Sequence, residues 1–148
     1  MKKTLLILLI LPLFLLIGCT NDKKATKNII DIVKKQTGIS IPQDANLIEK
    51  YETSLFLHGR LPKYYIFQFD KAPEEFLVNN TFQEVKNDVF EKNIINILEN
   101  ENKKYNLKIP EESLIKFDEL YLYTYQEDDY CLIYYPNDYK LIVFIISK

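Results

Sequence analysis

The segment over residues 139–147 constrains the fold of this chain most. Its side chains form two alternating rows that are both apolar, Leu141, Val143 and Ile145 in one row and Ile142, Phe144 and Ile146 in the other. Alternation with a period of two residues indicates a β-strand. Because a strand with two apolar faces is buried on both sides, the sequence predicts the central strand of a sheet here.

Two more strands are predicted just before this one. Residues 117–126 and 130–135 have strand-like patterns, and short polar segments at 127–129 and 136–138 separate the three strands. Pro136 suits the second position of a β-turn because its ring presets the φ angle. The C-terminal part is therefore expected to be a three-stranded antiparallel meander.

A hairpin and two helices are predicted upstream. Residues 45–55 and 63–70 are expected to pair as strands, with a long loop over 57–62. A short amphipathic helix is expected over 28–37 and ends before Gly38. A longer helix of about 20 residues is expected to begin at Thr81, where Thr81 and Glu84 fit a capping box, and its apolar stripe runs to Leu98.

Together these elements predict an α+β fold. The sheet is antiparallel, has about five strands and includes the C-terminal three-stranded meander, and a long and a short helix pack on one face. A length of 148 residues suits one domain, which is assigned to residues 29–148.

The beginning of the chain differs in character from this domain. Lys2 and Lys3 precede an apolar run of thirteen residues over 5–17, which is too short to span a bilayer but fits a secretory signal. The run ends in Leu16-Ile17-Gly18-Cys19, which resembles the lipobox of bacterial lipoproteins. The resemblance implies cleavage between Gly18 and Cys19 and attachment of a diacylglyceryl group to the Cys19 sulfur. Residues 1–18 would then be the signal peptide, and 19–28 the lipidated cysteine and a flexible tether.

This resemblance implies a protein held by its lipid on a membrane surface outside the cytoplasm. The surface would be the outer leaflet of the plasma membrane, or the outer membrane in a Gram-negative cell. Two acyl chains, such as palmitate, are enough for stable anchoring. An ordinary cleaved signal peptide and an uncleaved anchor are the alternatives. A second resemblance, in Ile41-Pro42-x-Asp44-Ala45 followed by His58-Gly59, is to uncharacterised Gram-positive lipoproteins and implies no activity.

Charge and composition exclude several classes of function. The chain has 19 basic and 21 acidic residues, so it lacks the excess of positive charge typical of nucleic-acid binding. One histidine and two cysteines offer little for a metal site, and neither a metal nor a cofactor is predicted. Without residues 1–18 the chain would have 17 basic and 21 acidic residues.

The tyrosines are the most unusual candidates for a binding site. Seven of the eleven lie between Tyr121 and Tyr139. Five of them could share one face of the meander, namely Tyr121, Tyr123, Tyr125, Tyr130 and Tyr134. Such a face could grip a protein or an envelope polymer. The alternative is that aromatic cross-strand pairs only stabilise the sheet.

The remaining reactive residues have simpler interpretations. His58 lies in the predicted loop, Cys131 is expected to be a buried free thiol, and Glu127-Asp128-Asp129 is expected to be a solvated turn. The sequence therefore predicts a lipid-anchored, non-catalytic interaction module. The alternative is a small cell-envelope hydrolase that uses His58 with a carboxylate.

Overall fold

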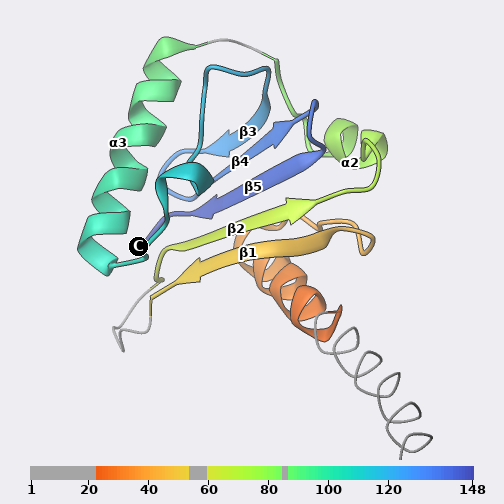
Figure 1. Cartoon of the computed structure of the whole chain (residues 1–148), viewed down its shortest axis with the longest axis horizontal. Helices are drawn as coiled ribbons and strands as arrows, with labels where there is room; N and C mark the ends of the chain where they lie inside the picture. Colours follow the sequence, from red (N-terminus) through yellow and green to blue (C-terminus); the bar gives the residue numbers. More distant parts are fainter. Residues whose placement is uncertain (1–22, 54–59, 85–86) are drawn as a thin grey trace, which may run out of the picture.

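An antiparallel sheet is the centre of the computed structural model, which describes residues 23–53, 60–84 and 87–148 (Figure 1). Within these residues the sheet has five strands in the order β1-β2-β5-β4-β3. The strands are β1 (Asn46–Glu52), β2 (Lys63–Gln68), β3 (Leu122–Gln126), β4 (Tyr130–Tyr135) and β5 (Lys140–Ile145). The predicted fold class, hairpin and C-terminal meander are confirmed.

Strand β5 is the middle strand, as its two apolar rows predicted. It pairs with β2 on one side and with β4 on the other, so that Val143 lies between Tyr65 and Leu132. Residues 141–145 are all buried. Both edges of β5 are hydrogen-bonded to neighbouring strands and both of its faces are covered.

The helices pack on both faces of the sheet, which corrects the expectation that they share one face. The N-terminal helix (residues 23–37) and α2 (Glu74–Asn79) contribute Ile29, Ile30 and Phe76 to the core that contains Val143. Helix α3 (Asp88–Tyr105) contributes Phe90, Ile94 and Leu98 to the core that contains Ile142. The two apolar rows of β5 require this arrangement, because helices on one face would leave the other row in water.

The N-terminal helix is longer than the sequence predicted. Within the described residues it begins at 23, so residues 23–28 are helical and are not part of a flexible tether. It ends as expected at Gly38, whose φ of 77° is accessible to glycine at little cost and whose N–H donates to the Lys34 carbonyl at 2.9 Å.

Helix α3 begins later than the sequence predicted. Asn87 is its N-cap, and its side-chain Oδ1 accepts hydrogen bonds from the N–H groups of Val89 (3.0 Å) and Phe90 (3.1 Å). The predicted capping box is wrong, because Thr81 has a left-handed backbone with φ of 52°. Gln83 instead exchanges two backbone hydrogen bonds with Tyr123, so this segment lies beside the outer edge of β3.

The polar residues 99–104, which follow the apolar stripe, form the last turns of the helix. Glu101 in these turns is buried, and its carboxylate accepts hydrogen bonds from the N–H (3.1 Å) and the hydroxyl (2.9 Å) of Ser147. The helix ends at Tyr105, after which Asn106 adopts the left-handed conformation. This contact joins the end of α3 to the segment that follows β5.

We predict that Asn87→Ala lowers the free energy of unfolding by about 1 kcal/mol, because two N–H groups of α3 lose their acceptor. Thr81→Ala should change it by less than about 0.5 kcal/mol, because Thr81 does not cap the helix. Urea unfolding followed by circular dichroism measures both values. A loss at Thr81 as large as the loss at Asn87 would contradict the observed helix start.

Candidate functional site

The five tyrosines predicted to form one aromatic face are divided between the two faces of the sheet. Strands β3 and β4 pair with Tyr123 opposite Ile133 and Tyr125 opposite Cys131. Residues directly opposite each other share a face, so these two tyrosines lie on the side of α3 together with Tyr121. Tyr130 and Tyr134 alternate with Cys131 and Ile133 and therefore lie on the other side, in the core of the N-terminal helix. The prediction of a shared face is wrong.

Packing contacts occupy most of these rings. Phe90 of α3 stacks on Tyr123 with the ring centroids 4.1 Å apart, and the Tyr121 hydroxyl donates to Glu91 Oε1 at 2.6 Å. Burial, followed by this hydrogen bond, raises the pKa of Tyr121. Tyr121 and Tyr134 are 6% and 1% exposed. These contacts favour the alternative interpretation, in which the tyrosines stabilise the sheet.

Cys131 is a free, fully buried thiol, as the sequence predicted. Burial raises its pKa well above the usual value, so the sulfur stays protonated at neutral pH. A protonated and inaccessible thiol is a poor nucleophile. Cys131 therefore acts as a small apolar residue of the core.

The acidic turn between β3 and β4 is only partly solvated. Glu127 and Asp128 are exposed as expected, but the Asp129 side chain is only 15% exposed and forms ion pairs with Arg60 and Lys148. Arg60 Nη2 also donates to the Asp129 carbonyl at 2.8 Å. Burial raises the pKa of Asp129, but the hydrogen bonds from Arg60 and Lys148 outweigh it and the net pKa is lowered. Asp129 thus joins three segments that are distant in the sequence.

A second polar cluster fastens the short helix η1 (Glu111–Ser113) to β1. The hydroxyl groups of Ser113 and Tyr51 both donate to Glu49 Oε2 at 2.6 Å, and the Tyr64 hydroxyl donates to the Ser113 carbonyl at 2.7 Å. Burial, followed by the bond to Glu49, raises the pKa of Tyr51. Within the described structure the acceptor of the Ser113 hydroxyl is the Glu49 carboxylate, and no histidine or lysine takes part in these bonds.

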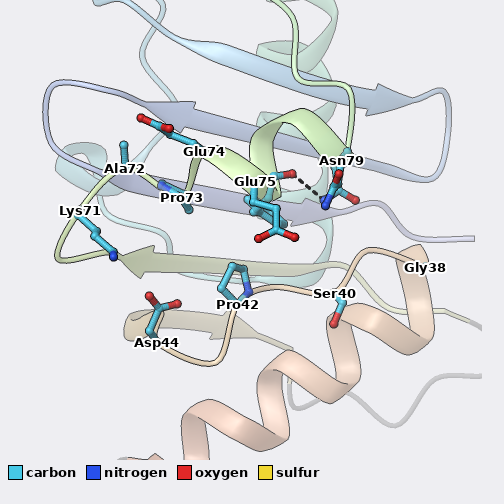
Figure 2. Close-up of a pocket in the computed structure, with 12 residues that line it drawn as sticks. Gly38, Ser40, Pro42, Asp44, Lys71, Ala72, Pro73, Glu74, Glu75 and Asn79 are labelled. Atoms are coloured by element: carbon cyan, nitrogen blue, oxygen red, sulfur yellow. Dashed lines mark hydrogen bonds between the residues drawn. The ribbon is translucent and has the colours of Figure 1, made fainter.

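A pocket at one end of the sheet is the best candidate for a binding site. It has a volume of about 660 Å³, within the usual range for small-ligand sites. Two segments distant in the sequence form it, residues 38–44 after the N-terminal helix and residues 71–80 at α2. Figure 2 shows α2 on one side of this space and the segment that contains Pro42 and Ser40 on the other.

Local backbone structure positions the two walls of the pocket. Gly38 turns the chain away from the N-terminal helix, and the N–H of Ala45 donates to the Pro42 carbonyl at 3.1 Å to close a turn. On the other wall α2 begins directly after Pro73, and Asn80 Nδ2 donates to the Phe76 carbonyl at 2.8 Å at its end. Prolines at such positions restrict the backbone before a ligand arrives.

The pocket has an apolar base and an acidic rim. Phe76 is buried in the core beneath it, whereas Asp44, Glu74 and Glu75 are exposed around it with Lys71. In Figure 2 the Glu75 carboxylate points into the space, Glu74 points away from it, and Lys71 and Asp44 face each other at one end. The Glu75 carboxylate is thus the acidic group that points into the space, and together with the acidic rim it favours a ligand that carries positive charge.

Several predicted site residues cannot be placed. Cys19, Gly18 and His58 lie outside the described residues, and the hydrolase alternative, which depends on His58, stays a prediction. Within residues 23–53, 60–84 and 87–148 no group of three or more histidine, cysteine or acidic side chains is arranged to hold a metal ion. None of the helices in those ranges has both the length and the apolar character needed to cross a bilayer.

The comparisons with known proteins identify no relative of this chain. No protein-family model matches the sequence, and neither a curated protein nor a solved structure matches it.

We predict that two Tyr→Phe substitutions differ in their effect on stability. The Tyr134 hydroxyl is buried and has no hydrogen-bond partner among the described residues, so Tyr134→Phe should be neutral or stabilising by up to about 1 kcal/mol. Tyr121→Phe removes the bond to Glu91 and should cost about 1 kcal/mol. Thermal unfolding compares the two variants. A large loss at Tyr134 would indicate a polar contact of its hydroxyl.

Proposed function

We propose that this chain is a bacterial lipoprotein, anchored through Cys19 on the extracytoplasmic side of a membrane. The run of thirteen apolar residues followed by Leu16-Ile17-Gly18-Cys19 is the observation that carries this proposal. The run is shorter than a membrane span and ends in a small residue and a cysteine, in the order that the lipobox requires. Residue 23 is helical and follows Cys19 by four residues, so an anchored domain would stand close to the membrane surface.

We further propose that the α+β domain is a non-catalytic binding module that uses the acidic pocket. The support is the pocket itself, which has an apolar base at Phe76 and the carboxylates of Asp44, Glu74 and Glu75 around it. A protein or an envelope polymer with exposed ammonium groups has the complementary charge. The tyrosine rings pack in the two cores and stabilise the sheet, so we place the binding site at the pocket and not at the tyrosines.

The anchor is tested by mass spectrometry of the N-terminal peptide of the full chain produced in a bacterial host. We expect the wild-type protein to begin at Cys19, to carry the mass of a diacylglyceryl group and to enter the detergent phase on phase separation. Cys19→Ala should keep residues 1–18 and lack the added mass. Wild-type protein recovered without acyl chains would overturn the anchor.

Cys131→Ala is the matched control for this experiment. Cys131 is the other cysteine of the chain and is fully buried, so its replacement should leave the lipid on Cys19 unchanged. Loss of the added mass in Cys131→Ala as well would mean that the modification is not specific to Cys19.

The pocket is tested by titrating the full chain in detergent micelles with a hexalysine peptide, with hexaglutamate as the negative probe. Amide NMR shifts should concentrate at Ser40, Asp44 and Asn79, which line the pocket. Exposed ion pairs contribute about 0.2–1 kcal/mol each. Loss of three such pairs amounts to about 0.6–3 kcal/mol, so the triple variant Asp44→Asn, Glu74→Gln, Glu75→Gln should raise the Kd by about threefold to about a hundredfold.

The control variant is Glu111→Gln, Glu112→Gln, Glu119→Gln, which removes three exposed carboxylates that do not line the pocket. It should leave the Kd within about twofold of the wild-type value, since screened surface charges contribute little at a distance. Equal weakening in both variants, or shifts spread over the whole acidic surface, would contradict a binding site at the pocket.

A further inference from the structure

Positive charge is concentrated on the N-terminal helix. Residues 23–37 contain five lysines and one aspartate, a net charge of +4, whereas residues 38–148 contain 12 basic and 19 acidic residues, a net charge of −7. The overall charge of −2 conceals this separation. The helix is therefore a basic surface on an acidic domain.

The packing of the helix turns these lysines outward. Ile29, Ile30 and Val33 are 5%, 1% and 0% exposed and pack against the sheet. With 3.6 residues per turn, the solvent-facing side carries Lys24, Lys27, Asp31, Lys34 and Lys35. All of these residues are exposed, as is Lys23 at the start of the described helix. We call Lys23, Lys24, Lys27, Lys34 and Lys35 the basic face.

The basic face is not neutralised by the rest of the domain. None of its five lysines forms a salt bridge within the described part of the chain. Asp44 and Asp70 line a hollow beside Lys23 and Lys27 at one edge of the helix, and Asp31 is the only acidic residue in 23–37. The positive charge of the face therefore remains available to an external partner.

The position of the basic face in the chain indicates which partner it meets. Lys23 follows Cys19 by four residues. Four peptide steps span at most about 14 Å even when fully extended. If Cys19 is the lipid anchor proposed above, the first turn of the helix stays within about that distance of the lipid headgroups, comparable to a Debye length of about 8–10 Å.

We infer that the basic face docks on an anionic phospholipid surface and lays the N-terminal helix along the membrane. The inference rests on the proposed anchor and deepens it, because it adds a second contact that orients the domain. Each lysine near an anionic surface strengthens membrane association on the order of fivefold. Two acyl chains already hold the protein on the membrane, so the consequence of such a face is that it selects which side of the domain faces the bilayer.

The inference is tested by labelling lysines with an impermeant amine-reactive ester and quantifying each site by mass spectrometry. The full chain is reconstituted into vesicles of phosphatidylcholine alone or of phosphatidylcholine mixed with phosphatidylglycerol. On the anionic vesicles the basic face should be labelled at least about threefold more slowly than on the neutral vesicles. Lys92 and Lys103, exposed on α3 at the opposite face of the sheet, should be labelled equally on both. Salt at about 1 M, where the Debye length is about 3 Å, should abolish the difference.

Two variants that each remove four lysines distinguish an effect of the basic face from an effect of total charge. The face variant carries Lys24→Gln, Lys27→Gln, Lys34→Gln and Lys35→Gln, and Lys23 remains as the reporter. The control variant removes four exposed lysines elsewhere, Lys92→Gln, Lys103→Gln, Lys108→Gln and Lys116→Gln. Glutamine has nearly the helix propensity of lysine, and Lys108 and Lys116 are exposed outside the helices, so both variants should fold. Protection of Lys23 on anionic vesicles should disappear in the face variant and persist in the control variant.

The outcomes distinguish this inference from the proposed anchor. The mass of the N-terminal peptide reports on the lipid, and the labelling ratio reports on the basic face. Equal labelling of the basic face on the two kinds of vesicle overturns the inference whether or not Cys19 carries lipid. Equal protection by soluble glycerol phosphate without vesicles would also overturn it, because the face would then bind free phosphate esters. Protection of these lysines on anionic vesicles without acylation of Cys19 would support membrane docking by the basic face and overturn the proposed lipid anchor.

Discussion

Burial of β5 on both of its faces is the constraint on which the rest of this structure depends. Residues 141–145 are buried in both rows, and each large apolar side chain taken out of water contributes about 1.5–3 kcal/mol. A strand of this kind needs a neighbour on each edge and cover on each face. Strands β2 and β4 supply the neighbours, and the helices supply the cover. The order of the sheet and the placement of helices on both sides follow from this one segment.

The charge separation follows from the same constraint. The N-terminal helix covers one row of β5 with Ile29, Ile30 and Val33, and a helix that buries one side must turn its other side to water. The lysines before and after the buried positions therefore lie on the solvent side and form the basic face, with Asp31 among them. The acidic residues lie on other elements, so the domain has two surfaces of opposite character, the basic face and the acidic pocket. Gly38 marks where the helix ends and the pocket begins.

The register of β3 and β4 explains why the tyrosines do not form a binding surface. Side chains of neighbouring strands lie on the same face of a sheet when their residues are directly opposite each other. Both strands contain several tyrosines, but the observed register places Tyr123 and Tyr125 of β3 opposite Ile133 and Cys131 of β4, not opposite tyrosines. Phe90 of α3 then packs on Tyr123 of β3. Tyr130 and Tyr134 of β4 pack in the core on the opposite face, which also contains the N-terminal helix. The tyrosine rings therefore stabilise the two cores. The candidate site is formed by exposed polar groups of loops and of α2.

The sequence by itself determined the class of the fold, the hairpin, the meander, the central strand and the burial of Cys131, because alternation of apolar residues is a local property. It also supplied the lipobox-like segment Leu16-Ile17-Gly18-Cys19, on which the proposed anchor rests. Tertiary structure alone decided which face each helix covers, that Asn87 and not Thr81 begins α3, and that Asp129 pairs with Arg60 and Lys148. The pocket could not be predicted from the sequence either, because its walls come from two distant segments, residues 38–44 and residues 71–80. Gly38, Pro42 and Pro73 mark turns locally, but only packing around β5 brings those turns together.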